Sequence, residues 1–417
     1  MPFGFFRISR SPVLADFGSS GLKLMQTSLG EAPVVTACAS IPFSDDLRSQ
    51  SLDARFEYIA KELPTVLREA NFTGTRVVLA PFSQHMLVQH VGVPAQEAAR
   101  ADMVVRTQIA IALGCDPAAL VVRTSAVCEN NRDGQPKIET IAFAMSREDV
   151  MRYVDLFRRA KLKVVGVHGE ISALVHAFDH VSRRIEDAAV SSMYIDLGYG
   201  GTKVAICHGA QLVFAKYLSI GGRTFDTRIA EARGVTLAAA RALRLSEGIR
   251  PVRSASSERV MSSTAGLPTL RGVPLGSDDS SEIQRSTSDC VVATDRRNAN
   301  NAPALGAPIA HEAARGIVTE TRETMENLAD ELGMCTRYHG GLFRDRRIDR
   351  VIFLGGEARD VGLCQALASS LRLPAKAGDP MARYLANGPM PTGTTDSVTA
   401  HAGWAAACGL ASAPTDL

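Results

Sequence analysis

The chain of 417 residues has almost no net charge and no long apolar segment. Lys and Arg number 46 against 44 Asp and Glu, so the formal net charge is +2 and no overall field draws the protein to nucleic acid. Because no run of about eighteen apolar residues occurs, we expect no membrane-spanning helix and no direct membrane insertion. The eight cysteines are scattered without a CxxC pair, which argues against a thiolate metal site or a disulfide framework and favours the reducing cytoplasm.

Apolar residues make up 46% of the chain, enough at this length to fill the cores of two or three compact units. Residues 76–160 follow the pattern strand, helix, two strands, helix, which predicts a small α+β module. Residues 250–310 are instead dominated by Ser, Arg, Asp, Asn, Pro and Gly and lack aromatic residues. Such a segment buries too little apolar surface to offset its ordering entropy, so it is predicted to be a disordered insert, either a solvated loop or a regulatory or partner-binding segment.

One design, strand–Asp–x–Gly–turn–strand, occurs twice, at residues 13–25 and 192–206. Asp16 and Asp196 each stand directly before a turn rich in glycine and small hydroxyl residues. Glycine lets successive backbone N–H groups approach an anion, and hydroxyls add donors, so both turns are predicted to bind a nucleotide phosphate tail. The predicted contacts are Gly18, Ser19, Ser20 and Lys23 in the first copy (unless strand alternation turns Lys23 outward) and Gly198, Gly200, Gly201 and Thr202 in the second.

Two carboxylates that face each other repel unless a cation lies between them. Hard oxygen ligands at a phosphate site favour Mg²⁺, which keeps several waters, so Asp16 and Asp196 are predicted to hold Mg²⁺ through its water shell. A third element, the apolar strand that ends in Gly355 and Gly356 before a helix, is predicted to lie against a base or ribose, the alternative being a tight turn without a ligand. A single strand–Asp–x–Gly turn also occurs in ordinary hairpins. Two such turns followed by a strand that ends in Gly-Gly favour a nucleotide site.

The motifs Asp16-Phe17-Gly18-Ser19-Ser20, Asp196-Leu197-Gly198-Tyr199-Gly200-Gly201-Thr202 and Leu354-Gly355-Gly356 resemble the phosphate and adenosine segments of the actin, FtsA and heat-shock chaperone ATPase superfamily, in the same order. Gly221 and Gly222 lie in a stretch similar to the Gly-Gly segment that follows the second phosphate segment there. The resemblance implies an α/β, actin-like (ribonuclease H-like) ATPase fold of two lobes with a small inserted α+β domain, binding ATP and Mg²⁺. The implied division is 11–75 and 161–190 for the first lobe, 76–160 for the inserted domain, 191–249 and 311–397 for the second lobe, 250–310 for the insert, and 398–417 for a C-terminal helix and tail.

Within that superfamily the chain resembles the PilM family of type IV pilus assembly. The opening at residues 15–24 is similar to that family's Asp-Ile-Gly-Ser-Ser-x-Val-Lys-Leu start, and the module lies between the phosphate segments as it does there. Val93-Pro94 and residues 162–166 also resemble PilM, whereas Phe17 replaces a β-branched residue and the insert replaces a shorter connection.

The resemblance implies a cytoplasmic ATP-binding scaffold or switch of a type IV pilus, or related type II secretion, assembly platform. Its implied partner is the cytoplasmic N-terminal peptide of a PilN-like inner-membrane protein, bound in a groove by the small domain. Other platform proteins, and the motor ATPases, would be further partners. The protein would then lie peripherally at the inner membrane through its partner.

Glu170 follows the module, where related proteins use an acidic or amide side chain to orient water or the metal; a helix-start glutamate favoured by the helix dipole is the alternative. No dedicated base stands out, so we expect at most a slow ATPase. Three alternatives remain open: a sugar- or acetate-kinase-like phosphotransferase of the same fold, an FtsA-like protein, and a scaffold that binds no nucleotide. We expect the second least, because FtsA usually ends in an amphipathic membrane helix and the last helix predicted here holds Trp404 and many alanines.

Overall fold

The computed structural model describes residues 9–130, 135–181, 185–249, 269–270, 307–391, 401–413 and 415. The predicted insert at 250–310 lies outside these residues, apart from the two-residue strand β12 (Thr269–Leu270) and the start of helix α8 (Ala307–Leu342). Within the described part, no helix has both the length and the apolar character needed to cross a bilayer.

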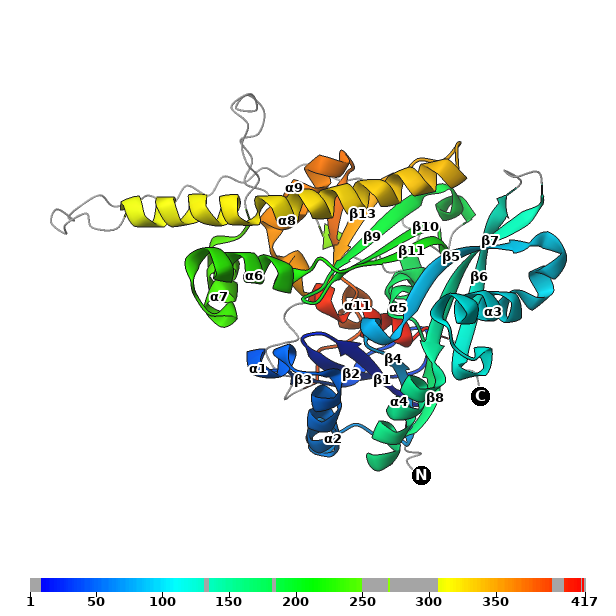
Figure 1. Cartoon of the computed structure of the whole chain (residues 1–417). Helices are drawn as coiled ribbons and strands as arrows, with labels where there is room; N and C mark the ends of the chain where they lie inside the picture. Colours follow the sequence, from blue (N-terminus) through cyan, green and yellow to red (C-terminus); the bar gives the residue numbers. More distant parts are fainter. Residues whose placement is uncertain are drawn as a thin grey trace, which may run out of the picture.

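The first lobe is built on a five-stranded sheet (Figure 1). An antiparallel meander of β1 (Val13–Gly18), β2 (Gly21–Thr27) and β3 (Val35–Pro42) is extended by β4 (Arg76–Ala80) and β8 (Lys163–Val167), which run parallel to β1, in the order β3-β2-β1-β4-β8. Helices α2 (Leu52–Glu69) and α4 (Arg147–Arg159) bury their apolar residues on one face of this sheet, and the short α1 (Asp45–Ser49) precedes α2.

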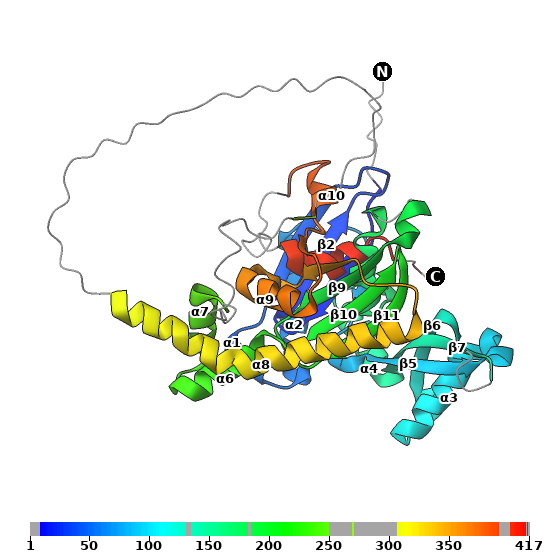
Figure 2. The same cartoon turned by 90° about the horizontal axis from the view of Figure 1, so that it is seen from above.

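The second lobe repeats this arrangement. Strands β9 (Ser191–Leu197), β10 (Thr202–His208) and β11 (Gln211–Leu218) form the meander, and β13 (Arg350–Leu354), β14 (Ala375–Gly378) and β12 extend it, in the order β11-β10-β9-β13-β14-β12. The long α8 crosses the outer side of this sheet beside α6 (Gly222–Arg233), α7 (Leu237–Glu247) and α9 (Val361–Leu371) (Figure 2). Because β1 and β9 occupy equivalent places, the two acidic residues that they carry lie at equivalent positions in the two lobes.

Two short helices fill the space between the sheets. Helix α11 (Ala405–Leu410) packs on β1 and β4 of the first lobe, and α5 (Glu170–His176) packs on β10 and β11 of the second. The helices cross so closely that a Cβ on Gly409 would lie 1.6 Å from the carbonyl oxygen of Ala173. Glycine at this crossing therefore sets the spacing of the two lobes.

The inserted domain has an antiparallel sheet of β5 (Leu87–Pro94), β7 (Lys137–Ser146) and β6 (Leu120–Asn130), covered by α3 (Ala101–Leu113). It is narrower than the predicted 76–160, because β4 pairs with β1 and β8 in the first-lobe sheet and α4 packs on β8. The sequence pattern predicts β4 and α4 but not the sheet that each one joins, and it misses β5.

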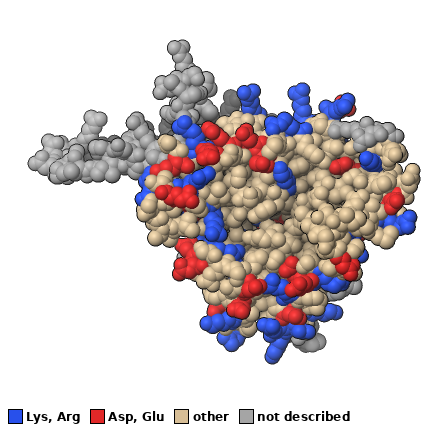
Figure 3. Space-filling model, in the orientation of Figure 1, with Lys and Arg blue, Asp and Glu red and all other residues tan. Residues whose placement is uncertain are grey.

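The small domain is docked on the second lobe. The His90 ring stacks on Phe214 of β11 at 5.0 Å and accepts a hydrogen bond from the backbone N–H of Ala215. Tyr338 of α8 donates to Glu139 at 2.8 Å. On the face drawn in Figure 3, Lys and Arg are interspersed with Asp and Glu around the rim, and the middle is mostly formed by other residues. This face shows no large field of one sign.

Candidate functional site

A cleft of about 270 Å³ opens where the carboxyl ends of β1 and β9 meet. Most of the predicted contacts line it, from both lobes: Asp16, Gly18, Ser19, Ser20, Lys23, Glu170, Asp196, Gly198, Gly355 and Gly356. The predicted residues Gly200, Gly201, Thr202, Gly221 and Gly222 are not part of its lining. The fold thus brings residues of the two turns and the Gly355-Gly356 segment to one place.

The second turn owes several of its glycines to close backbone packing. A Cβ on Gly201 would lie 2.3 Å from the Tyr217 hydroxyl, and one on Gly221 would lie 2.4 Å from the Gly201 nitrogen. Thr202 is fully buried and donates its hydroxyl to the Ile220 carbonyl at 2.7 Å. Gly201, Thr202 and Gly221 therefore support the turn without lining the cleft, a role that their spacing in the sequence does not reveal.

The third element brings its backbone against the second turn. Gly355 has a φ of +91°, and a Cβ there would lie 2.2 Å from the Leu197 carbonyl oxygen. Its N–H donates to the Ala402 carbonyl, which ties the strand end to the segment before α11. Only glycine fits both the conformation and the approach.

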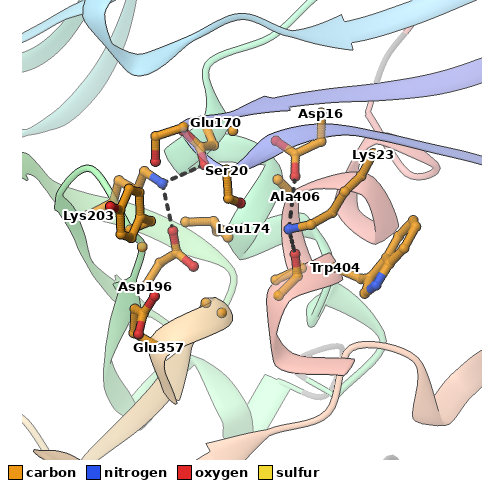
Figure 4. A pocket seen from close by; sticks show the side chains of 18 of the residues that line it. Asp16, Ser20, Lys23, Glu170, Leu174, Asp196, Lys203, Glu357, Trp404 and Ala406 are labelled. Carbon is orange, nitrogen blue, oxygen red and sulfur yellow. Dashed lines mark hydrogen bonds and ion pairs between the residues drawn. The ribbon is translucent and has the colours of Figure 1, made fainter. Parts of the chain in front are cut away.

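Asp16 is a buried carboxylate without a close counter-charge. It is 4% exposed, its Oδ1 has no hydrogen-bond partner among the described residues, and its Oδ2 lies 3.9 Å from the Lys23 ammonium. Lys23 donates to the Gly403 carbonyl and lies over the Trp404 ring (Figure 4). Burial raises the pKa of Asp16 to about 7, against the opposing effect of Lys23. A cation beside Oδ1 would stabilise the ionised form.

Asp196 has a close counter-charge that sequence reasoning missed. The Lys203 ammonium lies 2.9 Å from Asp196 Oδ2 and 2.6 Å from Glu170 Oε1 (Figure 4). Ser83 donates to the other Glu170 oxygen at 2.7 Å. Burial alone would lower the pKa of Lys203, but the two carboxylates outweigh it and raise that pKa above its ordinary value. The signal was available, because a tight β9–β10 hairpin pairs Lys203 directly with Asp196.

Tyr199 of the second turn is flanked by two arginines from different lobes. The Arg48 guanidinium, from α1, lies 5.1 Å from the ring centroid, and that of Arg241, from α7, lies 4.9 Å from it. Burial, and then the charge of Arg241, lowers the pKa of Arg48. Arg241 also lines the cleft. Arg241 therefore places a cation at the rim of the cleft beside the second turn, whereas Arg48 is paired with Asp45.

Arg244 of α7 links the segment that follows Gly355-Gly356 to helix α6. It is fully buried and donates to Asp226 of α6 at 2.6 Å and to Glu357, directly after Gly356, at 2.8 Å. This ion triad fixes the position of the third element relative to α6 and α7.

The donor set fits a phosphate with a bound cation better than a metal held by protein alone. No group of three or more His, Cys, Asp or Glu side chains suited to a metal ion occurs among the described residues. The buried Oδ1 of Asp16, without a partner among those residues, and the glycine backbone of both turns are instead what a nucleotide–cation complex requires.

Comparisons with solved structures identify the fold. A chain of a "PilM-PilN type IV pilus biogenesis complex" is similar over 96% of this chain and 97% of that one, with a TM-score of 0.67 and 17% identity. The fold is therefore the predicted actin-like ATPase fold. More distant similarities include the ethanolamine utilization protein EutJ from Carboxydothermus hydrogenoformans (TM-score 0.47, 11% identity, 96% and 88% covered) and MreB5 of Spiroplasma citri bound to ADP (0.42, 13%, 90% and 94%). Neither of these bears on function.

Sequence comparison identifies the family. No curated protein matches the chain. The family model for the type IV pilus assembly protein PilM matches residues 15–250, more than half of the chain. The predicted membership is confirmed: this chain belongs to the PilM family of type IV pilus assembly proteins.

Proposed function

We propose that the chain binds ATP with Mg²⁺ between its lobes and acts as a nucleotide-dependent scaffold or switch in a type IV pilus, or related type II secretion, assembly platform. The observation that carries the proposal is the meeting of two glycine turns, one from each lobe, at one cleft beside the buried Asp16. Contacts from both lobes to one ligand favour the closed arrangement, as a population shift requires.

The phosphates would lie against the two turns, with N–H groups and the Ser19 and Ser20 hydroxyls as donors and Lys23 as a point charge. The adenosine would lie towards Gly355, Gly356 and Arg241. Mg²⁺ would neutralise phosphate charge and be held through water, chiefly by Asp16, since Lys203 already neutralises part of the Asp196 charge.

Hydrolysis would be slow or absent. Glu170, the predicted catalytic residue, has one oxygen on Lys203 and the other on Ser83. With both oxygens engaged, we propose that Glu170 orders the cleft and does not activate a water. Turnover of about 1 s⁻¹ or more on a sugar or organic acid, a typical low kinase rate, would contradict the proposal and favour the phosphotransferase alternative.

The proposed partner is the cytoplasmic N-terminal peptide of a PilN-like inner-membrane protein. Two findings support it: membership of the PilM family and the similarity to a chain from a PilM-PilN complex. A cavity of about 20 Å³ at the junction of the first lobe, the small domain and the second lobe is too small for a peptide as it stands, so the groove would have to open there. Its apolar lining residues, which would contact the peptide, are Pro81, Met86, Val88, Phe143 and Ile171, and Ser83, Glu170, Lys203 and Tyr217 complete the polar side. The protein would then lie peripherally at the inner membrane through this partner.

Calorimetry with ATP and Mg²⁺ tests the nucleotide site. Wild type should bind, and Asp196→Ala should weaken binding more than Lys23→Ala, because Asp196 organises Lys203 and Glu170. Lys216→Ala is the matched control, because Lys216, on the neighbouring strand β11, pairs with Glu331 of α8 and is not part of the cleft lining. No binding by wild type would rule the switch out, and equal, negligible effects would count against the site.

The partner is tested separately by pull-down of single-pass inner-membrane proteins with the full chain. A PilN-like protein should be retained, and a Val88→Asp substitution should release it because the cavity would then hold a charge. Retention of the PilN-like protein by both forms would contradict the proposed groove.

A further inference from the structure

Lys203 is a buried lysine held between two carboxylates of the cleft. Its side chain is 11% exposed, and its ammonium contacts Glu170 Oε1 at 2.6 Å and Asp196 Oδ2 at 2.9 Å. Figure 4 shows the lysine between the two acids, on the side of the cleft opposite Lys23. Buried charges are rare unless paired, and here one cation pairs with two anions.

Three separate elements build this contact. The β9–β10 hairpin sets Lys203 directly opposite Asp196. Glu170 comes from the start of α5, the helix packed between the lobes, and Ser83 of the first lobe holds its second oxygen. The ammonium therefore links the second phosphate turn to the segment that joins the two lobes.

Carboxylates that converge in a nucleotide cleft need a cation between them, and a divalent ion is the usual solution. A lysine ammonium on the neighbouring strand can neutralise the same carboxylates, and it is part of the chain itself. Among the other carboxylates of the cleft, Glu357 is paired with Arg244. The cation nearest to Asp16 is the Lys23 ammonium, which is 3.9 Å away.

We propose that Lys203 is a built-in cation that takes the place of a divalent ion between Asp196 and Glu170. One consequence rests on the proposed nucleotide function. Mg²⁺ would assist ATP binding by this chain only through the phosphates and Asp16, and not through Asp196 or Glu170. Removal of Lys203 leaves two unneutralised carboxylates and turns that side of the cleft into a divalent-cation site.

The first test needs no nucleotide. Thermal unfolding of the full chain is measured in EDTA and in excess magnesium chloride for wild type, Lys203→Met and the control Lys216→Met. Magnesium should raise the midpoint of Lys203→Met by about 3 °C and leave the other two within about 1 °C, as expected for an ion bound only by the folded form. An equal response in all three proteins overturns the proposal.

The second test measures ATP affinity in EDTA and in magnesium. Chelation should weaken ATP binding by Lys203→Met at least about tenfold more than it weakens binding by wild type. An equal loss in both overturns the proposal. If no form binds ATP under either condition, the proposed function fails, whereas the inference about Lys203 is still decided by the magnesium response in the first test.

Lys203→Met is vulnerable to misfolding, because it leaves Glu170 and Asp196 buried without a cation. The double variant Lys203→Met/Glu170→Gln keeps the shape and removes one of the two charges. It should fold, and magnesium should raise its unfolding midpoint less than that of Lys203→Met. If Lys203→Met does not fold, magnesium should raise the midpoint of the double variant no more than that of wild type. A full magnesium response in the double variant places the ion elsewhere and overturns the proposal.

Discussion

The hydroxyl of Ser19 accepts a hydrogen bond of 2.8 Å from the backbone N–H of Gly200, so the first glycine turn touches the second. Gly200 allows this approach, because a Cβ there would lie 2.8 Å from the Ser19 Cβ. The Tyr217 hydroxyl holds the Gly200 carbonyl from the other side at 3.2 Å. The two lobes are therefore joined directly at the point where the proposed phosphates would bind, and a phosphate oxygen would compete with Ser19 for this N–H.

Gly200→Ala should push the two turns apart. The added methyl overpacks the contact, and we expect a loss of about 1–3 kcal/mol in the free energy of unfolding, measured in urea. Ser19→Gly in the same chain removes the opposing Cβ and should restore most of it. Gly340→Ala is the control, because a Cβ there meets nothing within 4 Å. A double variant no more stable than the sum of the two single effects would show that the turns do not touch.

Arg244→Met should be severely destabilising. The substitution leaves Asp226 and Glu357 buried without their cation, which typically costs about 3–5 kcal/mol. Urea unfolding measures the loss, and Arg228→Met, whose pairing with Glu323 is exposed, should change stability by only about 0.5 kcal/mol. Adding Glu357→Gln to Arg244→Met should recover part of the loss. A loss no larger than that of the control would mean that the triad is not closed in solution.

The doubled strand–turn design could be predicted from the sequence because it is local. Asp16 and Asp196 each stand at a strand end, and equivalent strands deliver equivalent ends. The motifs alone did not reveal the neutralisation of Asp196, because it depends on which side chain the β9–β10 register sets opposite that acid. That register gives Lys203 directly.

Other features depend on contacts between distant segments. Phe17 departs from the family pattern, and the structure gives the reason: it is fully buried with its ring among Phe56, Phe82, Tyr153 and Phe157. Those rings come from helices and a loop far along the chain, so no local pattern predicts them. Trp404 likewise lines the cleft from the short segment directly before α11, close to Lys23.

The arginines around Tyr199 should stabilise the closed arrangement of the lobes. A double-mutant cycle of Arg48→Ala and Tyr199→Leu, measured by urea unfolding, should give a coupling of about 0.5–1 kcal/mol, because the guanidinium stacks on the ring across the lobes. Tyr199→Phe should keep the coupling, since the interaction is with the ring. Strictly additive effects would contradict a contact between the lobes at this rim.

The pair His208 and His339 should make the protein sensitive to acid. Their Nε2 atoms lie 2.9 Å apart, and Phe343 packs against both rings, so one ring donates and the other accepts. Burial lowers the pKa of both histidines, which favours their neutral forms. Burial, followed by the charges of Arg346 and His339, lowers the pKa of His208 from 6.5 to about 4. The unfolded chain binds this proton first as the pH falls. The stabilisation is therefore complete above about pH 6.5 and is lost progressively towards pH 4.

We expect this histidine to cost the folded state about 1–2 kcal/mol at pH 5 relative to pH 7.5. Urea unfolding at the two pH values measures the loss in wild type and in His208→Leu, which keeps the apolar packing and has no proton to bind. The leucine variant should show a flatter dependence on pH, whereas His401→Leu, which alters a partly exposed histidine outside this pair, should retain the wild-type dependence. If His208→Leu loses as much stability in acid as wild type does, the acid sensitivity lies in other groups and the neutral pair has no part in it.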